Sequence, residues 1–104
     1  MPHLSKLYIA GPDVFLPDPI AAGERLKSIA LRYGFDPLFP FDNAIPLGDP
    51  YPSKTIFEAN AAMIRSADIV VANLNSFRGA EPDSGTVFEV GYARGLGKRV
   101  IGYI

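Results

Sequence analysis

Residues 68–74 (Asp-Ile-Val-Val-Ala-Asn-Leu) are the feature of this sequence that most restricts the fold. They form a short, nearly continuous apolar run rich in β-branched residues, which is typical of a strand covered on both faces. Strands of this kind occur in parallel sheets that have helices packed on both sides. The run therefore predicts an α/β fold rather than a sheet with one face in water.

The rest of the chain alternates as such a sheet requires. Strands are also predicted at residues 4–10, 35–39 and 98–104. A first helix is expected from an Asp18 cap and Pro19 to a stop at Gly34, and a third from an Asp83 cap to Gly97. The order β-α-β-α-β-α-β predicts a parallel sheet with right-handed crossovers and helices on both faces.

The second helix is predicted to begin at a Ser53 cap, after a loop over residues 40–52 that is rich in Pro, Asp, Asn and Gly. Its buried stripe is expected to consist of six apolar residues, namely Ile56, Phe57, Ala59, Ala62, Met63 and Ile64.

Composition limits the classes of function. A chain of 104 residues with 48% hydrophobic and 20% charged residues predicts one domain over residues 1–104. A net charge of -1 argues against nucleic-acid binding, and no apolar run is long enough for a membrane span, so a cytosolic protein is expected. The absence of cysteine and the single histidine argue against a metal site. We expect either that the fold ends on its last strand or that a C-terminal tail is missing.

Ligands of parallel α/β sheets bind at the carboxyl ends of the strands. Three predicted loops meet at that edge, over residues 11–18, 40–52 and 75–83. Six residues of these loops and the adjoining elements are expected to face one cleft: Tyr8, Phe15, Asp42, Asn43, Asp83 and Glu89.

Glu89 is the strongest catalytic candidate. It is flanked by Phe88 and Val90, and Gly85 and Gly91 leave room for a ligand to approach its helix. An ionised, partly desolvated carboxylate suits nucleophilic attack on an anomeric carbon. The alternative is a buried structural ion pair with Arg65 or Arg94. For Asp83, the simplest interpretation is a helix cap worth about 1 kcal/mol.

Four segments together resemble the nucleoside 2-deoxyribosyltransferase family, in the right order and over nearly the whole chain. They are residues 7–15 (Leu-Tyr-Ile-Ala-Gly-Pro-Asp-Val-Phe), 39–43 (Phe-Pro-Phe-Asp-Asn), 67–74, and 77–93. The most specific part is Asp-x-Gly-Thr-x-x-Glu-x-Gly, which runs from Asp83 to Gly91.

The resemblance implies a flavodoxin-like fold and the transfer of 2-deoxyribose between nucleobases with retention of configuration. It implies that Glu89 is the nucleophile that forms a deoxyribosyl ester and that Tyr8 orients Glu89. Asp83 corresponds to an aspartate that holds sugar hydroxyls, and Phe15 to an aromatic residue beside the base. The substrates would be deoxynucleosides and free nucleobases, and neither a metal nor a redox cofactor is needed.

The resemblance also implies a homo-oligomer (dimer, tetramer or hexamer), because a neighbouring subunit's C-terminal segment supplies an amide side chain to the site. The aspartate that protonates the base in some members aligns with Asn60, which is not an acid. Asp13, Asp42 or a water molecule are the alternative proton donors. The predicted substrate-binding set is completed by Gly11, Asp13, Asp42, Asn43, Asn60 and Gly85.

Simpler interpretations exist for several of these residues. Tyr8 could be only a core residue, Asp42 and Asn43 an Asx-turn, and Asn60 a hydrogen-bond partner of the loop before its helix. Arg78 could bind a phosphate or be solvated.

Two other functions remain open. One is hydrolysis of the glycosidic bond of deoxynucleoside 5'-monophosphates by the same glutamate, and the other is non-catalytic nucleotide binding. The first loop, Gly-Pro-Asp-Val-Phe, favours the transferase, because the hydrolases typically have a Ser- and Gly-rich loop there.

Overall fold

Four parallel strands form the sheet, in a computed structural model that describes residues 4–40 and 48–104. They are β1 (Lys6–Ala10), β2 (Asp36–Leu38), β3 (Ile69–Asn73) and β4 (Arg99–Tyr103), in the order β2-β1-β3-β4. This is the flavodoxin-like order for four strands, with its switch point between β1 and β3. The predicted α/β class and parallel sheet are confirmed, and each predicted strand is found with slightly shorter bounds.

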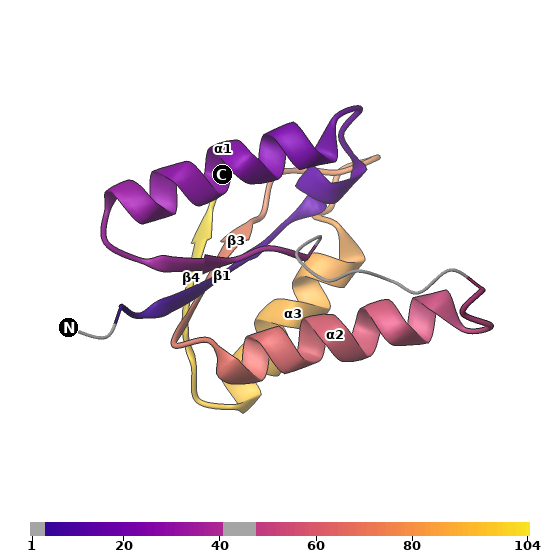
Figure 1. Ribbon diagram of the computed structural model, residues 1–104. Helices are drawn as coiled ribbons and strands as arrows, with labels where there is room; N and C mark the ends of the chain where they lie inside the picture. The colour runs from indigo at the N-terminus through magenta and orange to yellow at the C-terminus, as the bar shows by residue number, and fades with distance from the viewer. Residues whose placement is uncertain (1–3, 41–47) are drawn as a thin grey trace.

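The helices lie in two layers, one on each face of the sheet (Figure 1). Helix α1 (Pro19–Arg32) covers the face formed by Leu7 and Ile9 of β1, which pack with Leu26. Helices α2 (Pro52–Ser66) and α3 (Ser84–Gly95) cover the opposite face, where Tyr8 and Ala10 belong to the main core cluster. Because side chains alternate along a strand, neighbouring residues of β1 serve the two different layers.

The helix starts follow their caps. The side chain of Asp18 accepts a hydrogen bond from the backbone N–H of Ala21 at 3.0 Å, which confirms the predicted start of α1. The prediction for α2 is wrong by two residues, because Tyr51 is the N-cap, the helix begins at Pro52, and Ser53 lies inside its first turn without capping it. Proline already has the φ of a helical residue, so it can occupy the first helical position.

The loop predicted over residues 11–18 contains a short 3-10 helix, η1 (Pro12–Phe15). It is closed by a hydrogen bond from the backbone N–H of Leu16 to the carbonyl of Asp13 at 3.2 Å. Sequence patterns rarely predict such a single turn, because its bonds span only three residues.

Of the six residues predicted for the buried stripe of α2, only Met63 and Ile64 are buried. Ile56 is 41% and Phe57 is 52% exposed, Ala62 is also exposed, and Ala59 is partly buried. Phe57 and Ile64 are seven residues apart and share a helix side, but the N-terminal part of α2 extends beyond the carboxyl ends of the strands (Figure 1). There is no sheet there to cover Phe57, which instead contacts Phe88 of α3 with ring centroids 5.6 Å apart.

Among the helices formed by residues 4–40 and 48–104, none has the length and apolar character needed to cross a membrane.

Candidate active site

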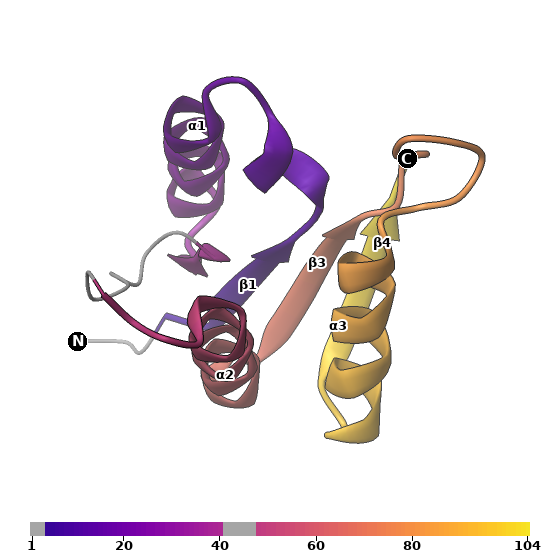
Figure 2. The ribbon, with the colours of Figure 1, turned by 90° about the vertical axis from the view of Figure 1, so that its right-hand side faces the viewer.

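The centre of the candidate site is a hydrogen bond between β1 and α3. The hydroxyl of Tyr8 donates to Oε2 of Glu89 at 2.6 Å, although the two residues are 81 positions apart in the sequence. Tyr8 has no exposed surface, and Glu89 is partly buried. The N-terminal end of α3, which carries Glu89 in its second turn, lies toward the arrowheads of the strands (Figure 2). The pair predicted as catalytic is thus brought together at the carboxyl edge of the sheet.

The surroundings of Glu89 raise the pKa of its carboxyl above the ordinary value. Burial is the largest cause, and the negative charge of Asp83 acts in the same direction. The hydrogen bond from Tyr8 opposes both, because a donor stabilises the ionised form. The pKa of Tyr8 is also raised, first by burial and then by the charge of Glu89, so this hydroxyl stays protonated and remains a donor.

The alternative interpretation of Glu89 as half of a buried ion pair is wrong for the part of the chain that the structure describes. Arg65 donates instead to the hydroxyl of Tyr92 at 3.0 Å, and Arg94 donates to the backbone carbonyl of Lys98 at 3.3 Å. A neutral phenol, not a cation, is the partner of the Glu89 carboxylate.

Asp83 is the N-cap of α3, as predicted. Its Oδ2 accepts two hydrogen bonds from Thr86, one from the backbone N–H at 3.0 Å and one from the hydroxyl at 2.9 Å. Gly85 lies against the same oxygen, since a Cβ added there would be 3.3 Å from Oδ2. Asp83 is near enough to Glu89 for its charge to raise the pKa of that carboxyl. Two carboxylates that share no helix face therefore border one region.

A second polar group lies where β1 and β3 end. The amide of Asn73 donates to Oδ2 of Asp13 at 3.4 Å, and its Oδ1 accepts from the backbone and the side chain of Asn75 at 3.0 and 2.7 Å. Gly11 is packed between these residues, because an added Cβ would be 2.7 Å from Oδ2 of Asp13 and 2.8 Å from Cβ of Asn73. The close approach of the two loops therefore requires glycine at position 11.

We expect Gly11→Ala to destabilise the protein by about 1–3 kcal/mol, because the methyl group overpacks the contact between the two loops. Urea unfolding measures the change in the free energy of unfolding. The matched control is Gly91→Ala, where an added Cβ has no neighbour within 4 Å and should stabilise α3 by about 0.5–1 kcal/mol. A Gly11→Ala variant as stable as the control would contradict the steric argument.

Asn60 of α2 carries a buried polar atom without a partner. Its Oδ1 is inaccessible to solvent and accepts no hydrogen bond from the residues that the structure describes. Residues 41–47 of the preceding loop lie outside the described residues, so the bond predicted between Asn60 and that loop stays a prediction. Asn60 is one helical turn N-terminal to Ile64, which belongs to the same core cluster as Tyr8. Buried acceptors are normally satisfied, so an unsatisfied one near a candidate site is consistent with a ligand contact.

The remaining predicted residues are less well defined. Phe15 ends the backbone of η1, and its side chain lies outside the described part of the structure. Asp42 and Asn43 also lie outside the described residues. The guanidinium of Arg78 lies 4.7 Å from the centroid of the Phe77 ring, so Arg78 is not simply solvated.

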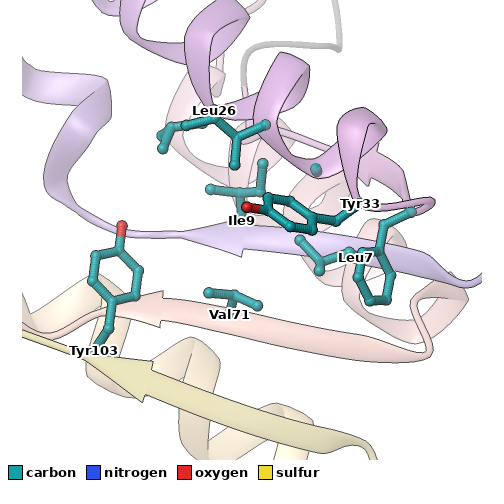
Figure 3. Close-up of a pocket in the computed structure, with 9 residues that line it drawn as sticks. Leu7, Ile9, Leu26, Tyr33, Val71 and Tyr103 are labelled. Atoms are coloured by element: carbon teal, nitrogen blue, oxygen red, sulfur yellow. The ribbon is translucent and has the colours of Figure 1, made fainter.

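An apolar pocket of about 370 Å³ opens between α1 and the sheet (Figure 3). Leu7, Ile9, Val71 and Tyr103 contribute to its lining from the strands, and no residue predicted for the site is among those that line it. Tyr8 points to the opposite face of β1, so this pocket is separate from the Tyr8–Glu89 pair.

The sequence analysis missed Thr86, Asn73 and Asn75. For Thr86 the signal was its position three residues after an Asp cap, where a side chain can bond back to the cap. For the asparagines it was a polar residue ending an apolar strand at the carboxyl edge.

Comparison with known proteins agrees with this architecture. Residues 7–104 match the model of the nucleoside 2-deoxyribosyltransferase family. A solved 2-desoxiribosyltransferase from Leishmania mexicana is 39% identical, with a TM-score of 0.81, over 95% of this chain and 63% of that one. An uncharacterized protein of Schizosaccharomyces pombe is 32% identical over 98% of this chain and 51% of its own length. A conserved protein from Enterococcus faecalis is 27% identical, with a TM-score of 0.76, over 96% of this chain and 63% of that one.

The chain thus spans about half of the Schizosaccharomyces pombe protein and about two thirds or less of the two solved structures. The family match, in contrast, extends over nearly all of the chain and includes both Tyr8 and Glu89. This chain belongs to the nucleoside 2-deoxyribosyltransferase family.

Proposed function

We propose that the protein transfers 2-deoxyribose from a deoxynucleoside to a free nucleobase through a covalent ester on Glu89. The observation that carries the proposal is the 2.6 Å hydrogen bond from the buried hydroxyl of Tyr8 to Glu89. It fixes one carboxylate oxygen and leaves the other available as a nucleophile. A partly desolvated carboxylate without a cationic partner is more reactive than a solvated or ion-paired one.

In the first step, a Glu89 carboxylate oxygen bonds to C1' of the sugar while the bond from C1' to the base nitrogen breaks. The electron pair of that bond leaves with the base, which takes up a proton. In the second step, the nitrogen of another base attacks C1', loses a proton, and Glu89 departs as the carboxylate. Two displacements on opposite faces of the sugar give retention of configuration. A 2-deoxy sugar suits this route, because no electron-withdrawing 2'-hydroxyl opposes positive charge at C1'.

The neighbouring groups supply binding. Asp83 accepts hydrogen bonds from sugar hydroxyls, and the amide of Asn60 contacts the base. Asn60 has no acidic proton, so the leaving base is protonated by Asp13, Asp42 or water. The proposal also includes that residues 1–104 form a single domain and that the protein is a homo-oligomer. Light scattering after size-exclusion chromatography measures the number of subunits.

The decisive assay is base exchange. The protein is incubated with deoxyinosine and free adenine, and chromatography should detect deoxyadenosine, with Glu89→Ala as the inactive control. Hypoxanthine released without deoxyadenosine would replace the transferase by a hydrolase, since water would then be the only acceptor. If no deoxynucleoside or deoxynucleoside 5'-monophosphate is turned over, a non-catalytic nucleotide-binding module is the remaining function.

A further inference from the structure

Thr86 has an environment unlike that of the other polar side chains. It is only 1% exposed and, apart from Tyr8 with its hydroxyl, it is the one buried residue with a polar side chain in the described part of the chain. A buried threonine in a helix usually bonds to the carbonyl one turn earlier. The hydroxyl of Thr86 donates instead to the carboxylate of Asp83 at 2.9 Å. The only predicted sugar-binding carboxylate therefore depends on a side chain that has no route to the ligand itself.

The two oxygens of Asp83 are not equivalent. Oδ2 accepts both the backbone N–H and the hydroxyl of Thr86, and it lies against Gly85. Within the described residues, no donor is hydrogen-bonded to Oδ1, and Asp83 is only partly buried. A helix cap needs only one oxygen, and the backbone N–H of Thr86 already satisfies that need. The hydroxyl bond is thus an additional restraint on the carboxylate.

We propose that Thr86 is a positioning residue, whose hydroxyl fixes the carboxylate of Asp83 so that Oδ1 is presented to a hydroxyl of the substrate's sugar. The inference rests on the proposed function, because it takes Asp83 as the sugar-binding group. Threonine suits the task, since its branched Cβ limits the rotamers about χ1 and its hydroxyl bond to Oδ2 holds Oγ1 at the carboxylate. Fixing the carboxylate before the substrate arrives reduces the entropy lost on binding.

Thr86→Val tests this, since it keeps the shape of the side chain and the backbone bond that caps α3 but removes the hydroxyl. We expect KM for deoxyinosine to rise about 3- to 10-fold, the value of one hydrogen bond, with kcat unchanged. Thr86→Ser retains the hydroxyl and should restore KM. Ser66→Ala is the control. It removes a hydroxyl that donates to the carbonyl of Met63 at the C-terminal end of α2, and it should leave KM unchanged.

Two further measurements separate positioning from a purely structural role. A 2',3'-dideoxynucleoside and a 2',5'-dideoxynucleoside each lack one sugar hydroxyl, and for one of them the Thr86→Val variant should show the same KM as the unmodified protein. In an Asp83→Ala background, Thr86→Val should have no additional effect on KM, because it acts through that carboxylate.

The outcomes are distinct from those of the base-exchange assay. If the unmodified protein exchanges bases but Thr86→Val leaves KM unchanged, or raises it equally for both dideoxy analogues, the positioning role is wrong and the proposed function stands. If Thr86→Val only lowers the melting temperature and Thr86→Ser restores it, Thr86 serves the helix cap alone. Absence of exchange by the unmodified protein would overturn both.

Discussion

Glu89→Gln is expected to slow base exchange on the order of 10³- to 10⁶-fold, the range seen when a covalent nucleophile is removed from an enzyme. Glutamine keeps the size of the side chain and an acceptor for the Tyr8 hydroxyl, but its amide oxygen is a poor nucleophile. Formation of deoxyadenosine from deoxyinosine and adenine measures the loss. Mass spectrometry of the protein after exposure to deoxyinosine alone should show one added deoxyribosyl group, which the variant lacks.

The control is Glu24→Gln on α1. Glu24 is 68% exposed and forms an ion pair with Lys27 at 3.2 Å, so its removal costs little and leaves exchange unchanged. Exchange by Glu89→Gln at the rate of the unmodified protein would show that another group attacks C1'.

Tyr8→Phe is the second substitution with a large expected effect. We expect about a 10- to 100-fold loss of exchange at neutral pH, since the hydrogen bond to an ionised group is lost. The substitution should also shift the pH dependence of the exchange rate in a definite direction. The bond from Tyr8 lowers the pKa of Glu89, so its removal raises that pKa further. The nucleophile must be ionised, and therefore the acidic limb of the pH–rate profile should move to higher pH in the variant.

Tyr92→Phe provides the matched control, because its hydroxyl contacts Arg65 on the surface rather than Glu89. Its pH–rate profile should coincide with that of the unmodified protein. An acidic limb that stays in place in Tyr8→Phe would mean that the hydroxyl orients Glu89 without affecting its ionisation.

The fold was predictable because its signals are local. Each signal depends on residues that are neighbours in the sequence. These signals are the apolar run of β3, the Asp18 and Asp83 caps, and the alternation of strand-like and helix-like hydrophobic patterns. The exposure of Phe57 was not predictable, since it depends on how far α2 extends past the sheet. A helical pattern shows which side of a helix is apolar but not where the opposing surface ends.

The candidate site was likewise predictable only in part. The residue types of Glu89 and Asp83 indicated their chemistry, and the family resemblance paired Glu89 with Tyr8. The ion-pair alternative could be rejected only after Arg65 and Arg94 were placed in space. Likewise, the bonding of Thr86 to one oxygen of Asp83, and the unsatisfied Oδ1 of Asn60, depend on rotamers that a sequence does not specify.

The position of β1 in the sheet has a kinetic consequence. β1 is paired with β2 on one side and with β3 on the other, and the backbone N–H of Lys6 bonds to Asp68, 62 residues away. Contacts between such distant segments form slowly, because the intervening chain must first be ordered. The Tyr8–Glu89 bond needs that strand pairing and also the docking of α3. We therefore expect the Tyr8–Glu89 contact, on which the proposed nucleophile depends, to form only after both of these steps.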